Sequence, residues 1–456
     1  MTKAKGMDLT RGPILKQLIS FSLPVMATSL LQQFYNTADQ IVVGKFAGVV
    51  AHAAVGSTGY VTNLILNLFV GMSVGATVTC AKFYGAKDRE RIGKTVHTSI
   101  ALALVSGLFL AVIGVLLSRP LLQLMDTPDD VIDHSVRYMS IIFLGSPFSM
   151  LYNFTSGLLR ASGDTKRPLY ILGVSGAVNV VLNLILVIFF RMAEAGVAIA
   201  TVSSQMVSSL WVLGIMIKRN DDMKVNIHRL KFHKDELLNI IKIGIPSGLN
   251  AILFNIANIT LQSTINSFGK EYMSASSAGT SVSNYINLVQ GAFGTATVSF
   301  VGQNYGAKKY KRITKVVLTA ILTLFVLTSI LAIIVSLIPK VLLGFFTTEA
   351  KVIEYGVGKL LIMSFGYILE VPAVVLAPAL RGMEKPKTPM FLNIFSIFVS
   401  RMFWIKYIFP LFPANTLFAF SMLYVCFPLS WVLSSISMTI AFLLYKKRFP
   451  IEEQPE

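Results

Sequence analysis

Charged residues are scarce in this sequence. Asp, Glu, Lys and Arg make up 14% of the 456 residues, whereas they make up about 25% of a typical soluble domain. Hydrophobic residues account for 54%, and the mean hydropathy is +0.67. Apolar stretches of about 20 residues, each long enough to cross a bilayer as a helix, recur along the chain. The composition therefore predicts an all-α membrane protein.

Cysteine and histidine are also sparse. The two cysteines, Cys80 and Cys426, both lie inside apolar stretches, which argues against a disulfide framework or a zinc site. The five histidines lie near the ends of apolar stretches or between them, so a histidine proton relay is not expected. Gly93-Lys94-Thr95 resembles the end of a phosphate-binding loop, but Asp88 stands where that loop requires glycine. The sequence therefore predicts no cofactor and no enzymatic activity.

The apolar stretches predict twelve transmembrane helices. Their approximate ranges are 14–42, 52–81, 95–118, 135–159, 168–190, 195–217, 238–266, 274–304, 316–338, 353–380, 390–411 and 417–445. If both termini are cytoplasmic, 30 of the 40 Lys and Arg residues fall on the cytoplasmic side. Since cytoplasmic loops carry the basic excess, this split predicts cytoplasmic termini. The net charge of +18 is thus an orientation signal and not a nucleic-acid-binding surface.

The chain repeats itself after about 221 residues. Tyr84-Gly85-Ala86-Lys87 recurs as Tyr305-Gly306-Ala307-Lys308, and Pro24 recurs as Pro246. Leu159-Arg160 recurs as Leu380-Arg381. Six spans in each copy predict two six-helix lobes of the same topology, as in transporters built from parallel repeats. The predicted organisation is an N-terminal lobe over 1–217, a cytoplasmic linker over 218–237, a C-terminal lobe over 238–445 and a cytoplasmic tail over 446–456.

Two acidic residues lie within apolar runs, Asp39 in the first span and Glu370 in the tenth. A carboxylate in the middle of a membrane is costly, so such a residue is a functional candidate by default. The alternative is a structural acid that hydrogen-bonds a neighbouring helix. At the positions that the repeat equates with these acids stand Leu261 and Ser149, so each acid belongs to one lobe and two sites with different roles are expected.

Two amides in the fifth span strengthen the first candidate. Asn179 and Asn183 are four residues apart, which places both on one helix face. With Asp39 they could offer oxygens to a small cation or hydrogen-bond a titrating carboxylate, and Thr201 in the sixth span adds a hydroxyl. The alternative is interhelical packing, which is common for Asn in membranes.

Taken together, these features resemble the multidrug and toxic compound extrusion (MATE) family over nearly the whole chain. The marks are the span-1 acid before Val43-Gly44, the two Tyr-Gly-Ala-Lys loops, the two Asn residues of the fifth span, Gly196 to Thr201, and Glu370 before Arg381-Gly382. The resemblance implies a multi-pass protein of a prokaryotic plasma membrane. It also implies export of cationic, amphipathic compounds in exchange for H⁺ or Na⁺.

The resemblance also implies site residues. Asp39, Asn179, Asn183 and Thr201 would form the N-lobe cation site, with Na⁺ at the first three if Na⁺ is the coupling ion. Glu370 would serve the C-lobe cation and substrate site. Many relatives carry an acid where this chain has Asn183, which removes one negative charge. Some relatives carry a span-7 Glu where this chain has Phe254, so the C-lobe site rests on Glu370 alone.

The alternative function is a flippase for a lipid-linked saccharide or a peptidoglycan precursor. Such a carrier needs cationic residues inside its cavity to hold pyrophosphate. Arg401 and Lys406 lie toward the outer end of the eleventh span, so the sequence favours export of organic molecules. The expected partners are small organic substrates and membrane lipid, with no nucleic acid, and the expected state is a monomer.

Overall fold

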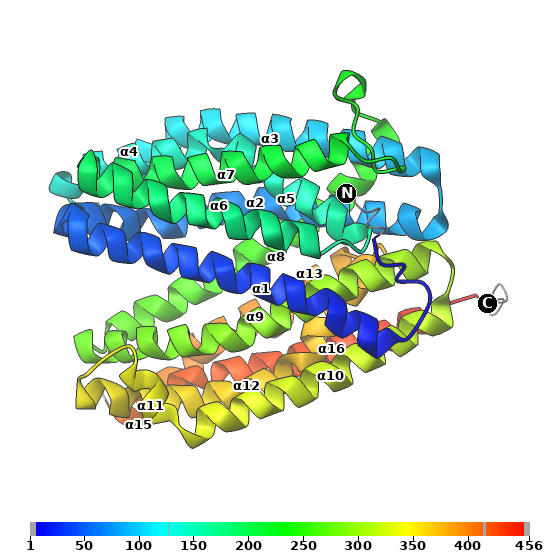
Figure 1. The fold of residues 1–456 in the computed structure, drawn as a ribbon. Coiled ribbons are helices and arrows are strands. Elements are labelled where there is room, and N and C mark those ends of the chain that lie inside the picture. The colour runs from blue at the N-terminus through cyan, green and yellow to red at the C-terminus, as the bar shows by residue number, and fades with distance from the viewer. Residues whose placement is uncertain (1–5, 126, 414–415, 451–456) are drawn as a thin grey trace. The chain divides into compact units, whose positions relative to one another are not determined.

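The computed structural model describes residues 6–125, 127–413 and 416–450, and every regular element in these ranges is helical (Figure 1). Within them, ten helices are long and apolar enough to cross a membrane. The predicted membrane-protein class is therefore confirmed. The fourth and eighth of the twelve predicted spans are not among the ten.

Local sequence explains both differences. The fourth predicted span is divided into α4 (Asp129–Leu144) and α5 (Ser146–Ala161), because the chain breaks at Gly145 and Pro147 begins the next helix. The eighth is α9 (Lys270–Gly306), which carries Ser, Asn and Gln along its length and is less apolar. The count of twelve, the six-plus-six arrangement and the orientation of the termini stay predictions.

The structure divides into two compact units. Unit 1 contains Met1–Asp8 and Leu23–Gly248, and unit 2 contains Leu9–Ser22 and Leu249–Glu456. Helices α1 (Ile14–Val42) and α8 (Lys234–Asn266) are each shared between the units, and each divides within two residues of its internal proline, Pro24 or Pro246.

Unit 1 is built from helices packed side by side. Besides its parts of α1 and α8 and the pair α4 and α5, it contains η1 (Val43–Ala47), α2 (Val49–Ala86), α3 (Arg89–Leu124), α6 (Lys166–Asn183), η2 (Leu184–Phe189), α7 (Ala193–Ile217) and η3 (Ile227–Arg229). One buried cluster joins α2, α3, α5 and α7 through residues such as Phe83, Ile100 and Leu158. Cys80 is fully buried in this cluster.

Unit 2 has the same all-helical construction. Besides α9 it contains α10 (Tyr310–Leu337), α11 (Pro339–Gly344), α12 (Ala350–Gly382), α13 (Lys387–Asn393), η4 (Ile394–Val399), α14 (Ser400–Phe403), η5 (Trp404–Ile408), η6 (Phe409–Leu411), α15 (Leu417–Tyr424) and α16 (Cys426–Lys446). Its core is aromatic, with Tyr367, Phe420, Tyr424 and Trp431 buried together, and Cys426 is 1% exposed.

Backbone turns repeat at the interval seen in the sequence. Gly48 and Gly269, Lys87 and Lys308, and Gly163 and Glu384 form three pairs, each separated by 221 residues, and all six residues have a positive φ. Left-handed backbone is uncommon outside glycine, so its recurrence at matched positions is informative. Corresponding helices of the two sequence copies therefore begin or end through the same turns.

Small residues let α2 and α8 approach backbone to backbone within unit 1. A Cβ at Gly71 would lie 2.3 Å from the backbone nitrogen of Gly248, and a Cβ at Gly75 would lie 2.2 Å from the carbonyl oxygen of Ile240. A Cβ at Gly244 would lie 2.6 Å from Cα of Met72. Each helix contributes two glycines four residues apart, the spacing that lets membrane helices pack closely.

The predicted linker packs against unit 1. Met223 and Val225 are 0% and 1% exposed. The backbone N–H of His233 donates to Thr98 Oγ1 at 3.1 Å, and Arg91 Nε donates to Glu236 Oε1 at 3.0 Å. The linker is therefore held to the end of the unit formed by α3, α5 and α7.

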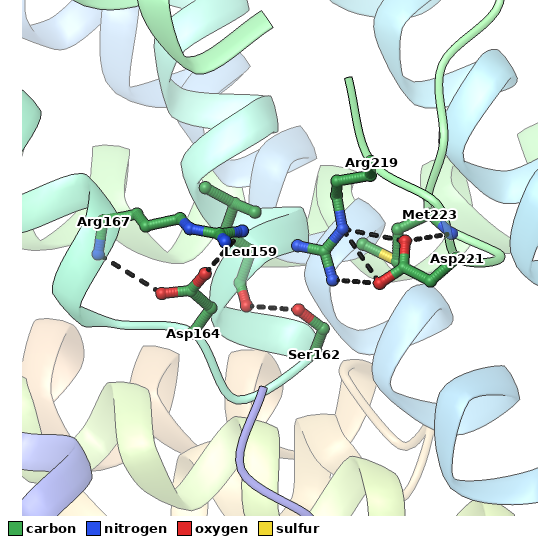
Figure 2. Close-up of polar contacts among 7 residues, drawn as sticks. All are labelled: Leu159, Ser162, Asp164, Arg167, Arg219, Asp221 and Met223. Atoms are coloured by element: carbon green, nitrogen blue, oxygen red, sulfur yellow. Dashed lines mark hydrogen bonds and ion pairs between the residues drawn. The ribbon is translucent and has the colours of Figure 1, made fainter. Parts of the chain in front are cut away.

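Two acid–base pairs organise the turns at this end of unit 1 (Figure 2). Arg167 lies 3.3 Å from Asp164, and Arg219 forms a bidentate pair with Asp221. Asp221 also accepts the backbone N–H of Met223 at 3.2 Å. Burial raises the pKa of Asp221, but the hydrogen bonds and charge of Arg219 outweigh it and leave the pKa below its ordinary value.

We expect acid to loosen this turn. Because the pKa of Asp221 is lower in the folded state, its stabilisation is present above the unfolded pKa of about 3.9 and is lost as pH falls through the folded pKa. In the wild type, the amides around Met223 and Val225 should lose protection against hydrogen exchange as pH falls through the folded-state pKa of Asp221. Asp221→Asn should exchange fast already at neutral pH and lose the acid dependence.

The adjacent Asp222→Asn is the matched control for this experiment, because Asp222 is 41% exposed and its pair with the largely exposed Arg89 is 3.6 Å long. Equal exchange rates in the two variants would contradict a specific role for Asp221.

Candidate functional site

The structure brings Asp39, Asn179, Asn183 and Thr201 together inside unit 1. Asn183 Nδ2 donates to Asp39 Oδ1, and Thr201 Oγ1 donates to Asp39 Oδ2 at 3.4 Å. Asn183 Nδ2 also lies 3.3 Å from Asn179 Oδ1, and Asn179 Nδ2 donates to Thr201 Oγ1 at 3.5 Å. The four side chains predicted for the N-lobe site therefore form one hydrogen-bonded cluster from α1, α6 and α7.

Close packing of α1 on α6 sets the position of the carboxylate. Gly176 leaves room for the ring of Tyr35, since a Cβ there would lie 1.7 Å from Tyr35 Cζ. The Tyr35 hydroxyl donates to the carbonyl of Gly173 at 3.1 Å. Asp39 follows Tyr35 by about one helical turn, and Asn179 and Asn183 follow Gly176 by one and two turns. The two helices are therefore in register where the polar groups meet.

Irregular backbone follows Asp39 on one helix and Asn183 on the other. The π-helical segment η1 begins four residues after Asp39, and η2 begins directly after Asn183. Such segments are frequent at functional sites. Around them Val42, Val43, Val187 and Val197 form a buried apolar cluster.

The oxygen atoms of the Asp39 cluster can bind a proton or a small hard cation. Asn183 is fully buried, and its Oδ1 accepts no hydrogen bond from any residue that the structure describes. A buried carbonyl oxygen without a donor is costly. Together with the Asp39 carboxylate and Thr201 Oγ1, it offers oxygen ligands of the kind that hard cations prefer. A protonated Asp39 could instead donate to this oxygen.

Glu370 lies on α12 in unit 2, whereas the Asp39 cluster lies in unit 1. The carbonyl of its neighbour Leu369 accepts from Ser435 Oγ at 2.8 Å. Arg401 lies on α14 in the same unit. The guanidinium of Arg401 lies 4.1 Å from the Phe427 ring centroid and donates to Ser430 Oγ at 3.1 Å.

Sequence reasoning missed several buried ionisable groups, among them Arg401, Lys359 and Glu194. Arg401 is 3% exposed, although the sequence placed it toward the outer end of the eleventh span. Lys359, which the sequence analysis did not single out, is 4% exposed. Glu194, counted as a helix end, is 1% exposed and lies 3.0 Å from His134 Nδ1 and 3.5 Å from Arg137. For Lys359 a signal was present, since it lies six residues inside the tenth predicted span.

Comparison with known proteins gives one consistent family. The MatE family model matches residues 24–185 and 246–405. A probable multidrug resistance protein of Bacillus subtilis, YpnP, is 30% identical over 399 residues, which cover 87% of this chain and 89% of that protein. Another from the same organism, YoeA, is 28% identical over 395 residues and 85% of each chain.

A solved structure shows the same fold. The outward-facing conformation of a multidrug resistance MATE family transporter of the MOP superfamily has a TM-score of 0.90 to this chain. The match covers 98% of this chain and 99% of that one at 21% sequence identity. The chain therefore belongs to the MatE family of multidrug efflux transporters and is a multi-pass membrane protein.

Proposed function

We propose that this protein is a secondary active antiporter that exports amphipathic organic compounds, mainly cations, in exchange for H⁺ or Na⁺. The observation that carries this proposal is the Asp39 cluster. It joins one carboxylate, two amides and a hydroxyl, and no residue in the described part of the chain donates to the buried Oδ1 of Asn183.

Loading of the cluster would change its hydrogen bonds. Asn183 Nδ2 and Thr201 Oγ1 both donate to Asp39, the pattern suited to an ionised carboxylate. A proton on Asp39 would remove one acceptor and add a donor, and Na⁺ would draw carbonyl and hydroxyl oxygens toward itself. Either ion would therefore alter contacts among α1, α6 and α7, which is how a bound ion can bias one conformation over another.

The topology proposed for this cycle has twelve spans in two lobes, with both termini in the cytoplasm. The distribution of Lys and Arg supports it, and the paired turns at an interval of 221 residues support the duplication. We propose no cofactor other than the coupling ion, and a monomer as the working state.

Glu370 is proposed as the cation and substrate site of the C-lobe. A proton and an organic cation would both neutralise this carboxylate, so binding of one would exclude the other. Such competition is the minimum requirement for exchange.

The flippase alternative is not favoured by the multidrug relatives. Lys359 and Arg401 do supply buried cations in unit 2, which such a carrier needs. However, Lys359 Nζ already donates to three protein oxygens, and Arg401 lies against Phe427 and Ser430. Neither side chain is free to hold a pyrophosphate without rearrangement.

Purified protein in liposomes tests the proposed function. A fluorescent organic cation should move against its concentration gradient when a pH gradient or a Na⁺ gradient is imposed, and only the coupling ion's gradient should drive it. Absence of movement with both gradients, at normal dye binding, would contradict the proposal.

A further inference from the structure

Lys359 is a buried lysine that the proposed site does not use. It lies on α12 and is 4% exposed. Nζ donates to the carbonyl of Ser276 at 2.6 Å, to Ser276 Oγ at 3.2 Å and to Thr280 Oγ1 at 2.6 Å. The ring of Tyr424 lies 4.9 Å from Nζ. All of these partners are uncharged.

The fold makes room for this side chain. A Cβ at Gly279 would lie 2.9 Å from Lys359 Cδ, so glycine at this position of α9 lets the aliphatic stem lie along the helix. Tyr424 Oη donates to Ser276 Oγ at 2.8 Å and holds that hydroxyl beside the amine. The lysine is therefore built into the contact between α9, α12 and α15.

Among the residues that the structure describes, no carboxylate pairs with Lys359. Glu271 pairs with Lys351 at 3.9 Å near the start of α9 and α12. Glu370, Arg401 and Tyr367 lie farther along α12 and on α14, and Tyr424 is the titratable group in contact. Burying an ammonium with only neutral partners is costly, and a lysine can relieve that cost by releasing its proton.

The three oxygens around Lys359 Nζ suit both the protonated and the neutral amine. A hydroxyl can accept from an ammonium or rotate and donate to a neutral amine, and two of the three ligating oxygens are hydroxyls. Thr280 is exposed while Lys359 is buried. Thr280 Oγ1 therefore links the buried amine to the surface of the helix pair through a single side chain.

We infer that Lys359 is a second proton-coupling group in unit 2, one that carries the proton as an ammonium and repels cationic substrate while charged. This inference rests on the proposed function and narrows its coupling ion to H⁺, because an amine binds a proton and not Na⁺. Glu370 and Lys359 would then respond in the same sense, since proton uptake at either makes unit 2 more positive and disfavours an organic cation.

The expected size of the effect on cation binding follows from the distance between Lys359 and Glu370. Glu370 is eleven residues beyond Lys359 on α12, or about 16 Å along the helix and close to the same face. Two unit charges about 16 Å apart, at an effective dielectric constant of about 20, change a binding constant about fivefold. Linkage makes the effect reciprocal, so bound cation should favour proton release by the same factor.

Two substitutions with opposite expected outcomes test the inference. Equilibrium binding of a cationic dye and of a neutral dye would be measured on purified protein across the pH range. Lys359→Met should bind the cation about fivefold more tightly than wild type at the acid end and equally at the alkaline end. Lys359→Arg should match wild type at the acid end and bind about fivefold more weakly at the alkaline end. Neutral dye should be unaffected.

Controls separate this inference from a structural role and from the proposed function. Lys351→Met is the matched control, because Lys351 lies on the same helix and its side chain is 72% exposed. Lys359→Gln replaces Lys359→Arg if the larger side chain prevents folding, and it should behave as Lys359→Met.

Uniformly weaker binding of both dyes at every pH would overturn the inference and would indicate that Lys359 only holds the neighbouring helices together. Wild-type pH dependence in Lys359→Met would also overturn it, while normal export by Asp39→Asn would instead refute the proposed coupling site.

Discussion

Asp39→Asn is expected to abolish gradient-driven export while leaving the protein folded and able to bind its substrates. Asparagine is nearly isosteric with aspartate, so it can still fill the space between α1, α6 and α7. Its carbonyl oxygen can accept from Asn183, and its amide nitrogen can donate to the Thr201 hydroxyl in place of the bond that Asp39 accepts. It cannot take up a proton, and it offers no charge to Na⁺. Removal of the charge should therefore remove coupling without removing the hydrogen-bonded scaffold.

The measurement has two parts. Export is followed in liposomes under the gradient that drives the wild type, and dye binding is followed at equilibrium on the same preparation. Asp133→Asn is a suitable control, since Asp133 is 70% exposed and makes a surface pair with Arg119 at 3.1 Å. Normal drug resistance in cells that express Asp39→Asn at the wild-type level would rule out Asp39 as the coupling residue.

The second large effect is expected at the glycine crossing of α2 and α8. In Gly71→Ala the new methyl group would lie 2.3 Å from the backbone nitrogen and 2.4 Å from Cα of Gly248. Backbone atoms cannot move aside by changing rotamer, so the helices must separate. Overpacking of this kind costs about 1–3 kcal/mol or more, and thermal unfolding in detergent should shift to clearly lower temperature.

Gly56→Ala provides the comparison. Gly56 lies on the same helix as Gly71, and a Cβ there would meet nothing within 4 Å. There alanine should be neutral or slightly stabilising, as expected from its helix propensity. The double variant Gly71→Ala/Gly248→Ala should be less destabilised than the sum of the single variants, because both report on one crossing. Equal melting temperatures for Gly71→Ala and Gly56→Ala would show that the close approach does not exist in solution.

The membrane class could be predicted from the sequence, and so could the four side chains that meet around Asp39, whose role as a cation site stays a prediction. Asp39 was identifiable because a carboxylate inside an apolar run is rare, and Asn179 and Asn183 because their spacing places them on one face. The partnership of α2 with α8 was not predictable, since a four-residue glycine spacing marks a close approach without naming the partner. Packing of the linker depends on contacts such as His233 with Thr98, which join residues far apart in the chain.

Lys359 shows why side-chain environment resists prediction from sequence. Counting basic residues by side treats each lysine as a solvated charge, and long lysines near span ends commonly reach water. Whether Lys359 does so depends on the missing Cβ at Gly279 and on two hydroxyls of the neighbouring helix. Those features belong to a pairing of α9 with α12 that the sequence does not state.

The burial of both thiols has a practical consequence for stability measurements. Cys80 is fully covered and Cys426 is 1% exposed, so neither should react with a bulky fluorogenic maleimide while the protein is folded. Heating would expose one reporter in unit 1 and one in unit 2. The unaltered chain thus carries its own unfolding probe in each unit, and replacing one cysteine at a time by serine would assign each melting step to a unit.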